Sequence, residues 1–181
     1  ATHLWKYDIN FTIQQRIPDN HHFYYRNISS LHEDFRRRIE NYPGLGTPIS
    51  STDEIRGGAT QFLVILDSEQ LQLHGEIEQK LSDYSVIRST SPIDNQAIWT
   101  EIFAPDVNKG TSCQLLLNQL NLRYEECAGL GNDYNDIDFL NRCGHPFIVS
   151  NAPESLREQF DTMPADEDNG LAAFVRHSLN L

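Results

Sequence analysis

The sequence predicts an α/β fold in two parts, an open sheet carrying helices followed by parallel strands joined by crossover helices. Apolar and polar residues alternate from Trp5 to Ile13, which is the period-two pattern of a half-buried strand. Residues 61–103 follow a strand, helix, strand, strand order, and residues 126–160 alternate strand and helix. The second order is typical of a parallel sheet with crossover connections.

The first hundred residues are expected to form a small open sheet with helices on one face. The expected elements are strands over 5–13 and 22–25, a helix over 30–42, a loop over 43–60, a strand over 61–66, a helix over 68–83, and strands over 85–88 and 97–103. The capping-box spacing of Ser30 and Glu33 opens the first helix. Leu71, Ile77 and Leu81 form one side of the second helix.

The last third predicts a parallel sheet. The expected elements are an amphipathic helix over 113–120, strands over 126–130 and 146–149, and helices over 137–141 and 154–160. The polar turns 131–136 and 150–153 each follow a strand. Ligands of such sheets bind outside the carboxyl ends of the strands, so both turns are expected to border one crevice.

Composition excludes several classes of function. The chain has 181 residues and a formal net charge of −12, which disfavours binding to nucleic acid or to an anionic membrane surface. No apolar run approaches the length of a membrane span. Three sparse cysteines predict neither a disulfide framework nor a zinc site, and a cytoplasmic location is expected.

Polar residues with metal and phosphate chemistry gather at the predicted crevice. Lys109 precedes a helix and offers a positive charge for phosphate. Asn132, Asp133, Asn135 and Asp136 offer hard oxygen atoms, the ligands that Mg²⁺ prefers. Asn-Asp-rich turns are also common as plain turns, because these side chains bond their own backbone. Spacing alone favours that plain interpretation.

Four motifs follow one another in the last half of the chain: Asn108-Lys109-Gly110-Thr111, the run from Gly131 to Leu140, Ser150-Asn151-Ala152-Pro153-Glu154, and Asp166-Glu167-Asp168-Asn169-Gly170. In register, they resemble the C-terminal half of haloacid-dehalogenase (HAD) superfamily phosphatases, in particular the Cof-type sugar phosphatases. The order and the gaps agree over residues 61–181.

The resemblance implies a Rossmann-like core with an inserted α/β cap. Residues 1–104 would be the cap domain, and 105–181 the C-terminal part of the core. Lys109 matches the lysine that neutralises the nucleophilic carboxylate and the transferring phosphoryl group. Asp136 matches the last acidic residue of the Mg²⁺-binding motif, and Asn151 matches an asparagine near the same site.

Two departures from the family pattern stand out. Asn132 occupies the position of the first aspartate of the metal motif, and the neighbouring Asp133 is the alternative ligand. The nucleophile motif, Asp-x-Asp-Gly-Thr, is absent, and Asp8-Ile9-Asn10-Phe11-Thr12 only mimics its spacing. The chain is therefore expected to be the downstream part of a longer enzyme, lacking roughly 80–100 residues that carry the nucleophile and the first core strands.

Other candidates have weaker patterns. His21, His22, His32 and Glu33 match no metal-ligand spacing, and Arg36-Arg37-Arg38 is expected to pair with neighbouring acids on a solvated helix face. Phe23, Tyr24 and Tyr25 are expected in the cap core, the alternative being that they line a substrate pocket of the cap together with Arg26. Arg88, at the end of a cap strand, is the candidate for contacting the leaving group.

The sequence thus predicts a Mg²⁺-dependent HAD-type phosphatase for a small phosphorylated metabolite, with sugar phosphates the favoured class. It would act through an aspartyl-phosphate whose nucleophile comes from an N-terminal core segment, so this chain by itself would be inactive. The alternative is a non-catalytic HAD-like protein that binds a ligand or a partner, which Asn132 and the absent nucleophile favour.

Overall fold

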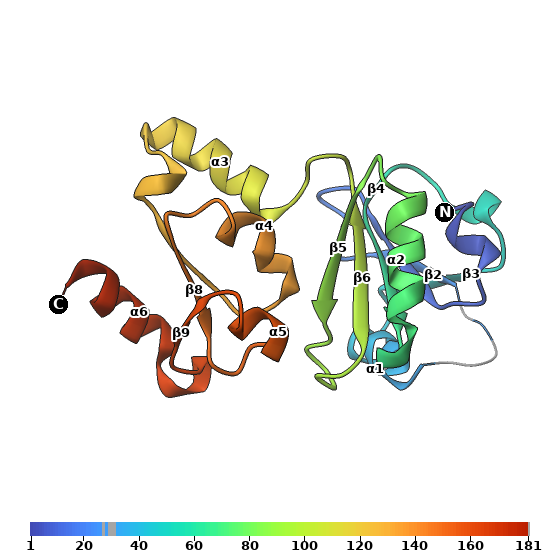
Figure 1. Ribbon diagram of the computed structural model, residues 1–181. Helices are drawn as coiled ribbons and strands as arrows, with labels where there is room; N and C mark the ends of the chain where they lie inside the picture. Colours follow the sequence, from blue (N-terminus) through green and yellow to red (C-terminus); the bar gives the residue numbers. More distant parts are fainter. Residues whose placement is uncertain (27, 29–31, 181) are drawn as a thin grey trace. The chain divides into compact units, whose positions relative to one another are not determined.

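The chain folds into two compact units, Ala1–Asp106 and Val107–Leu181. The computed structural model describes residues 1–26, 28 and 32–180 (Figure 1). Ser30 and Leu31, at the predicted start of the first helix, lie outside the described residues. Within the described part of the chain, no helix is both long and apolar enough to cross a bilayer.

The N-terminal unit is built on a six-stranded mixed sheet. Its strands are β1 (Phe11–Gln15), β2 (Phe23–Arg26), β3 (Gly46–Ile49), β4 (Ala59–Leu66), β5 (Ser85–Thr90) and β6 (Ile98–Phe103). Their order in the sheet is β3-β2-β1-β4-β6-β5. The β2–β3 pair is parallel, and the other neighbours are antiparallel. Two helices pack on this sheet, α1 (Glu33–Asn41) and α2 (Leu71–Lys80).

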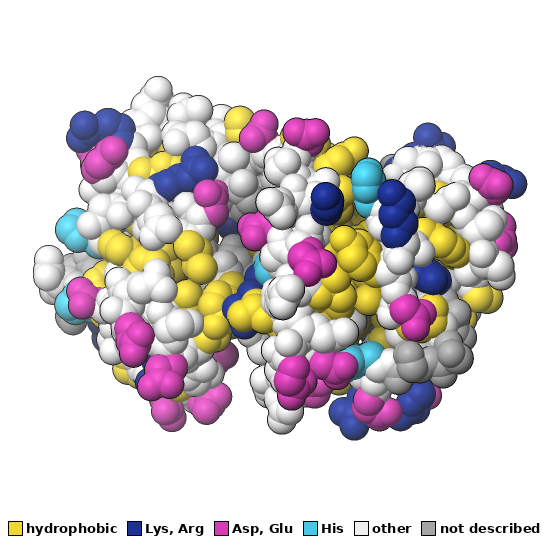
Figure 2. Space-filling view, turned by 45° about the vertical axis from the view of Figure 1, so that its right-hand side comes forward, with side chains coloured by type: hydrophobic (Ala, Val, Ile, Leu, Met, Phe, Trp, Pro, Cys, Tyr) yellow, Lys and Arg dark blue, Asp and Glu magenta, His cyan; other side chains and the backbone are white. Residues whose placement is uncertain are grey.

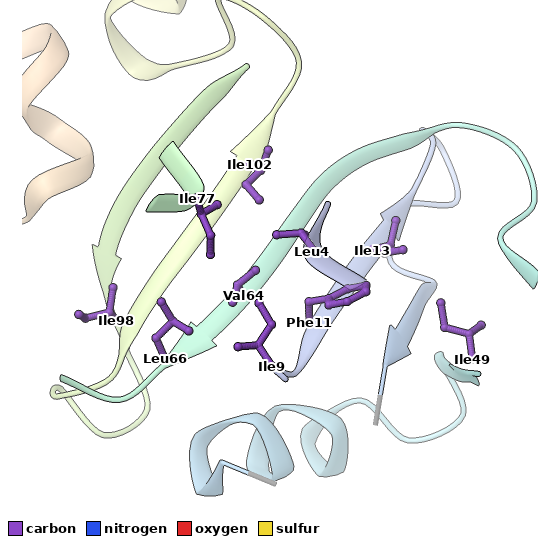
Figure 3. Close-up of a cluster of buried hydrophobic side chains, with 10 residues drawn as sticks. All are labelled: Leu4, Ile9, Phe11, Ile13, Ile49, Val64, Leu66, Ile77, Ile98 and Ile102. Atoms are coloured by element: carbon purple, nitrogen blue, oxygen red, sulfur yellow. The ribbon is translucent and has the colours of Figure 1, made fainter. Parts of the chain in front are cut away.

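The two helices cover opposite faces of the sheet. Val64 and Leu66 of β4 pack with Ile77 of α2 in the larger core cluster (Figure 3). Leu63 and Ile65 point to the other face and pack with Phe35 of α1. Successive strand residues alternate between faces, so β4 is buried on both sides. The prediction of helices on one face is therefore wrong.

The predicted strand over 5–13 is shorter than expected. Leu4–Lys6 forms a 3₁₀ turn, η1, and the strand begins only at Phe11. The guanidinium of Arg26 donates to the carbonyl oxygens of Trp5 at 3.3 Å and Tyr7 at 2.5 Å. These contacts hold the segment folded against the sheet. Apolar and polar residues alternate in this segment because Trp5 and Tyr7 pack on the core cluster, not because the segment is a strand.

The predicted loop over 43–60 contains regular structure. β3 pairs with β2, and Thr52–Glu54 forms a further 3₁₀ turn. Pro48 cannot donate to a neighbouring strand, but β3 lies at the edge of the sheet, where proline is tolerated.

The helix predicted over 68–83 begins with the 3₁₀ turn Ser68–Gln70 and continues as α2. Its buried residues are His74 and Ile77, whereas Leu71 is 46% exposed. The prediction that Leu71 lies on the buried apolar side of this helix is therefore wrong.

The C-terminal unit contains a three-stranded parallel sheet, as predicted. Its strands are β7 (Ala128–Gly131), β8 (His145–Val149) and β9 (Asp161–Met163), in the order β7-β8-β9. Its helices are α3 (Lys109–Leu120), α4 (Ile137–Leu140), α5 (Glu154–Arg157) and α6 (Gly170–Leu179). The sequence pattern predicts no helix or strand beyond residue 160, so β9 and α6 are elements that it does not predict.

The helix α3 buries less of its apolar side than the sequence predicts. Leu117 is buried, but Leu116 and Leu120 are 55% and 56% exposed. The core of this unit forms instead under α4 and α5, around Leu140, Ile148 and Leu156.

Charged side chains are dispersed over the face drawn in Figure 2. Asp and Glu side chains are spread across both units on the face seen in Figure 2, with Lys and Arg between them. That face carries no continuous basic area among the described residues, in keeping with the net charge of −12.

Candidate active site at the carboxyl end of β7

Lys109 is the first residue of α3, and a side-chain cap fixes its position. The Asn108 side chain accepts the backbone N–H of Thr111 at 2.8 Å, and the N–H of Asn108 donates to the Thr111 hydroxyl at 3.3 Å. This capping box ends the preceding chain in an extended conformation and starts the helix at Lys109.

The turn after β7 is organised by Asp136. Its Oδ2 atom accepts the backbone N–H of Asn132 at 2.7 Å and that of Asp133 at 3.2 Å. Gly131 lets the strand approach, because a Cβ there would lie 2.7 Å from both Asp136 Cβ and Leu140 Cδ1. Asp133 caps the short turn that follows, accepting the N–H of Tyr134 at 2.8 Å. Two carboxylates of the predicted polar cluster, Asp133 and Asp136, therefore stabilise the backbone of the turn that contains them.

The structure brings Lys109 and Asp136 into direct contact. The Lys109 ammonium donates to Asp136 Oδ1 and, at 3.0 Å, to Asn135 Oδ1. The Asp136 side chain is 5% exposed and that of Lys109 is 48% exposed. A buried carboxylate is therefore paired with an ammonium that still reaches solvent, so the cationic partner is the accessible one at the carboxyl end of β7.

The second polar turn lies at the same edge of the sheet. β7 and β8 are parallel neighbours with Gly131 opposite Ile148, so the chain leaves both strands at one edge. Asn151, just after β8, donates to Asp166 Oδ1 at 2.5 Å. This hydrogen bond, together with the backbone N–H of Glu167, lowers the pKa of Asp166. The third and fourth motifs are thus joined by one contact.

Arg88 belongs to the N-terminal unit. It stands opposite Thr100 on β6, whose hydroxyl lies 2.8 Å from His74 Nδ1. Burial lowers the pKa of His74, and the positive charge of Arg88 lowers it further. The structure therefore places Arg88 on the face of the sheet covered by α2.

His32 and the three arginines of α1 make local structural contacts. His32 caps α1 by accepting the Asp34 N–H at 3.1 Å, and its Nε2 lies 3.1 Å from Asp67. Arg36 and Arg37 pair with Glu33, as the sequence predicts. Arg38 departs from that prediction, since its half-buried guanidinium lies over the Trp99 ring, 5.1 Å from the ring centroid.

The chemistry of the donors suits a hard cation, but the set is small. Asn132 is exposed, and Asp133 and Asp136 are buried carboxylates already engaged by N–H groups. Across residues 1–26, 28 and 32–180, no group of three or more His, Cys, Asp and Glu side chains is arranged to hold a metal ion. Mg²⁺ needs only one or two carboxylates beside waters and phosphate oxygens, so these residues fit part of its shell.

One contact at the site had no signal in the sequence. The Tyr124 hydroxyl donates to the carbonyl of Gly110 at 2.5 Å, next to Lys109. Tyr124 lies before β7 and belongs to none of the sequence motifs. Its contact with α3 results from the tertiary fold.

Known proteins share both sequence and fold with this chain. A 73-residue stretch is 36% identical to a phosphoglycolate phosphatase of Methanothermobacter thermautotrophicus and covers 40% of this chain and 33% of that protein. A 129-residue stretch is 25% identical to an HMP-PP phosphatase of Yersinia pseudotuberculosis and covers 68% of this chain and 45% of that protein. The chain thus spans less than half the length of these two relatives.

Solved structures show the same fold. A protein of Streptococcus mutans superimposes with a TM-score of 0.76 at 15% identity, over 98% of this chain and 64% of that one. A sugar phosphatase of HAD subclass IIB gives a TM-score of 0.71 at 12% identity, over 97% and 63%. The model of the haloacid dehalogenase-like hydrolase family matches residues 1–175, and the chain therefore belongs to that family.

Proposed function

We propose that the protein containing this chain is a Mg²⁺-dependent phosphomonoester hydrolase for a small phosphorylated metabolite, with sugar phosphates the favoured class. The observation that carries the proposal is the contact between Lys109 and Asp136 at the carboxyl end of β7. The names of the relatives, which are phosphatases, support the same class of reaction.

Lys109 would neutralise charge at the transferring phosphoryl group. Its ammonium is half-exposed, and Asp136 and Asn135 hold it in place from one side. A preorganised cation stabilises the negative charge that gathers on the phosphoryl oxygens without having to reorient during the reaction.

Asp136, with Asn132 or Asp133, would hold the cation. Asp136 has one lone-pair site left on Oδ1 beyond its two N–H contacts and its ammonium contact, and the Asn132 side chain is exposed. When bound, Mg²⁺ would offset phosphate charge and orient the phosphoryl group. The two backbone N–H groups fix the Asp136 carboxylate, so that it needs no rearrangement to meet a cation.

The nucleophilic aspartate would come from an N-terminal core segment, which attacks phosphorus and forms an aspartyl-phosphate. β7 is an edge strand of its sheet among the described residues, with one side open to pairing. Exposed leucines of α3, Leu115, Leu116 and Leu120, offer apolar surface for the same segment. A parallel strand added beside β7 would end next to Lys109.

The remaining residues would serve the substrate. Residues 1–104 would act as the cap and 105–181 as part of the core. Asn151 would contact the substrate near its phosphate, and Arg88 its leaving group. Three free cysteines are compatible with a reducing, cytoplasmic location.

One observation favours a second function, a non-catalytic HAD-like protein that binds a ligand or partner. Asn132 brings an amide where the family motif has a carboxylate, so the site lacks one negative charge for a metal. Such a protein would keep the Lys109–Asp136 contact as a phosphate-binding feature.

The deciding experiment measures p-nitrophenyl phosphate hydrolysis against Mg²⁺ concentration, for this chain and for the complete reading frame. We expect Mg²⁺-dependent turnover only from the longer protein, and an Asp-x-Asp-Gly-Thr motif encoded upstream of Ala1. An upstream stop codon, or a complete protein that binds phosphate without turnover, would support the binding protein instead.

A further inference from the structure

Tyr124 holds the first turn of the helix that carries Lys109. It lies in the 3₁₀ turn Tyr124–Glu126 between α3 and β7 and is 7% exposed. Its hydroxyl donates to the carbonyl oxygen of Gly110 at 2.5 Å. Since Gly110 directly follows Lys109, the contact acts on the residue next to the lysine.

The backbone of Tyr124 is itself anchored. Its carbonyl oxygen accepts the N–H of Cys127 at 3.0 Å and that of Gly144 at 2.9 Å. Gly144 is packed so closely that a Cβ there would lie 2.1 Å from the Glu125 carbonyl oxygen. The turn that carries Tyr124 is therefore held by hydrogen bonds and close packing against the segment that enters β8. The backbone from which the Tyr124 side chain extends is thus fixed in position.

Gly110 is also confined by α4 and by the segment that follows it. A Cβ at Gly110 would lie 2.0 Å from Asp138 Oδ2 and 3.0 Å from Arg142 Nε. Asp138 and Arg142 form an ion pair at 3.1 Å. The α4 helix begins immediately after Asp136. The elements that carry Lys109 and Asp136 thus meet at Gly110, between Tyr124 and Asp138.

The hydroxyl remains a donor through the neutral range. Burial, followed by the neighbouring Cys113 thiol, raises the pKa of Tyr124 to about 12. A protonated phenol can donate to a carbonyl, whereas a phenolate can only accept.

We infer that Tyr124 is a positioning residue for Lys109: its hydrogen bond to the Gly110 carbonyl fixes the first turn of α3 so that the ammonium reaches Asp136. The kinetic part of this inference rests on the proposed function, because it assigns Lys109 a role in turnover. The geometric part concerns only the ion pair.

The test compares Tyr124→Phe with Tyr84→Phe, by NMR of this chain and by kinetics of the complete protein. Phenylalanine keeps the buried ring and removes only the hydroxyl, while Tyr84 is 51% exposed in the N-terminal unit and serves as the matched control. This chain contains three lysines, Lys6, Lys80 and Lys109, so ¹⁵N-lysine NMR of this chain by itself gives few ammonium signals to assign. An ammonium held by a carboxylate exchanges its protons slowly with water.

We expect Tyr124→Phe to speed proton exchange of the Lys109 ammonium by about 2- to 10-fold, the equivalent of one ordinary hydrogen bond. The value of kcat/KM should fall by about the same factor, chiefly through kcat. Tyr84→Phe should change neither quantity.

Unchanged Lys109 exchange in Tyr124→Phe would overturn the inference, even if the melting temperature fell, since the hydroxyl would then serve stability alone. Faster exchange with unchanged kcat would overturn its kinetic part. Failure of the proposed function is distinguishable, because full activity of Lys109→Met would refute the role of the lysine while the exchange measurement still reports on Tyr124.

Discussion

The Lys109 ammonium contacts Asp136 Oδ1 and thereby joins the first residue of α3 to the turn that follows β7. Three donors converge on this one carboxylate, the ammonium and the backbone N–H groups of Asn132 and Asp133. The carboxylate is buried and the ammonium half-exposed. The pair therefore has one fixed partner and one partner accessible to an anionic ligand.

Replacement of the lysine tests its role in charge neutralisation. In the complete protein, Lys109→Met should lower kcat/KM for p-nitrophenyl phosphate by about 10²–10³-fold, the usual effect of removing one preorganised group from a transition state. Lys80→Met, at an exposed position of α2, is the matched control and should retain activity. Comparable activity in the two variants would contradict the role of Lys109.

Replacement of Asp136 should affect both activity and stability. Asp136→Ala leaves the N–H groups of Asn132 and Asp133 without their acceptor and should reduce the free energy of unfolding by about 2–4 kcal/mol. Mg²⁺-dependent turnover should be abolished. Asp136→Asn retains an acceptor oxygen and should recover much of the stability but not the activity.

These two Asp136 variants separate folding from chemistry. Urea unfolding of this chain gives the stability, and the phosphatase assay of the complete protein gives the activity. Full activity in Asp136→Asn would show that the carboxylate charge is not needed.

The buried His74 predicts a pH dependence of stability. Burial lowers its pKa below the value of 6.5 that the unfolded chain would have. As the pH falls below 6.5, the unfolded state takes up a proton that the folded state does not, so the free energy of unfolding should decrease. Above that value the histidine is neutral in both states and the contribution is complete.

The check is a series of urea titrations between pH 7.5 and the acid limit of folding. His74→Gln keeps a hydrogen-bonding group beside Thr100 and should flatten the slope below pH 6.5. His21→Gln, at an exposed histidine, should leave the slope as it is. Equal slopes in all three proteins would remove His74 as the cause.

Parts of this fold follow from local sequence and parts do not. The strand β4 was predictable because it ends in an uninterrupted apolar run, and most of α3 because apolar residues recur at helical spacing over 113–120. The segment around Trp5 was not, since its conformation depends on Arg26, which is distant in the sequence. Nor could periodicity assign α1 and α2 to opposite faces, because every residue from Leu63 to Leu66 is buried.

The candidate site shows the same division. The carboxyl ends of parallel strands predict that the turns after β7 and β8 share an edge, and the family resemblance selects Lys109 and Asp136 from the polar residues. The plain turn interpretation was also partly right, as Asp133 and Asp136 bond their own backbone. The Tyr124 contact was beyond prediction, since no local pattern links a residue in a 3₁₀ turn to the carbonyl of Gly110.

Asn132 offers the sharpest choice between an enzyme and a binding protein. Its side chain is exposed directly after β7, and its backbone N–H is already held by Asp136. Asn132→Asp adds a carboxylate of nearly the same shape at this point. For a Mg²⁺ site, an added charged ligand should raise the affinity of the complete protein for Mg²⁺ by about 10-fold, because ligand charge is a main determinant of affinity.

Isothermal titration with Mg²⁺ measures this affinity, and the phosphatase assay shows whether the metal concentration for half-maximal activity falls in parallel. Asn118→Asp places the same charge at an exposed position of α3 and is the matched control, which should leave the affinity unchanged. If titration detects Mg²⁺ binding neither in the parent nor in Asn132→Asp, the turn after β7 is not a metal site. The Lys109–Asp136 pair would then act in phosphate binding without turnover.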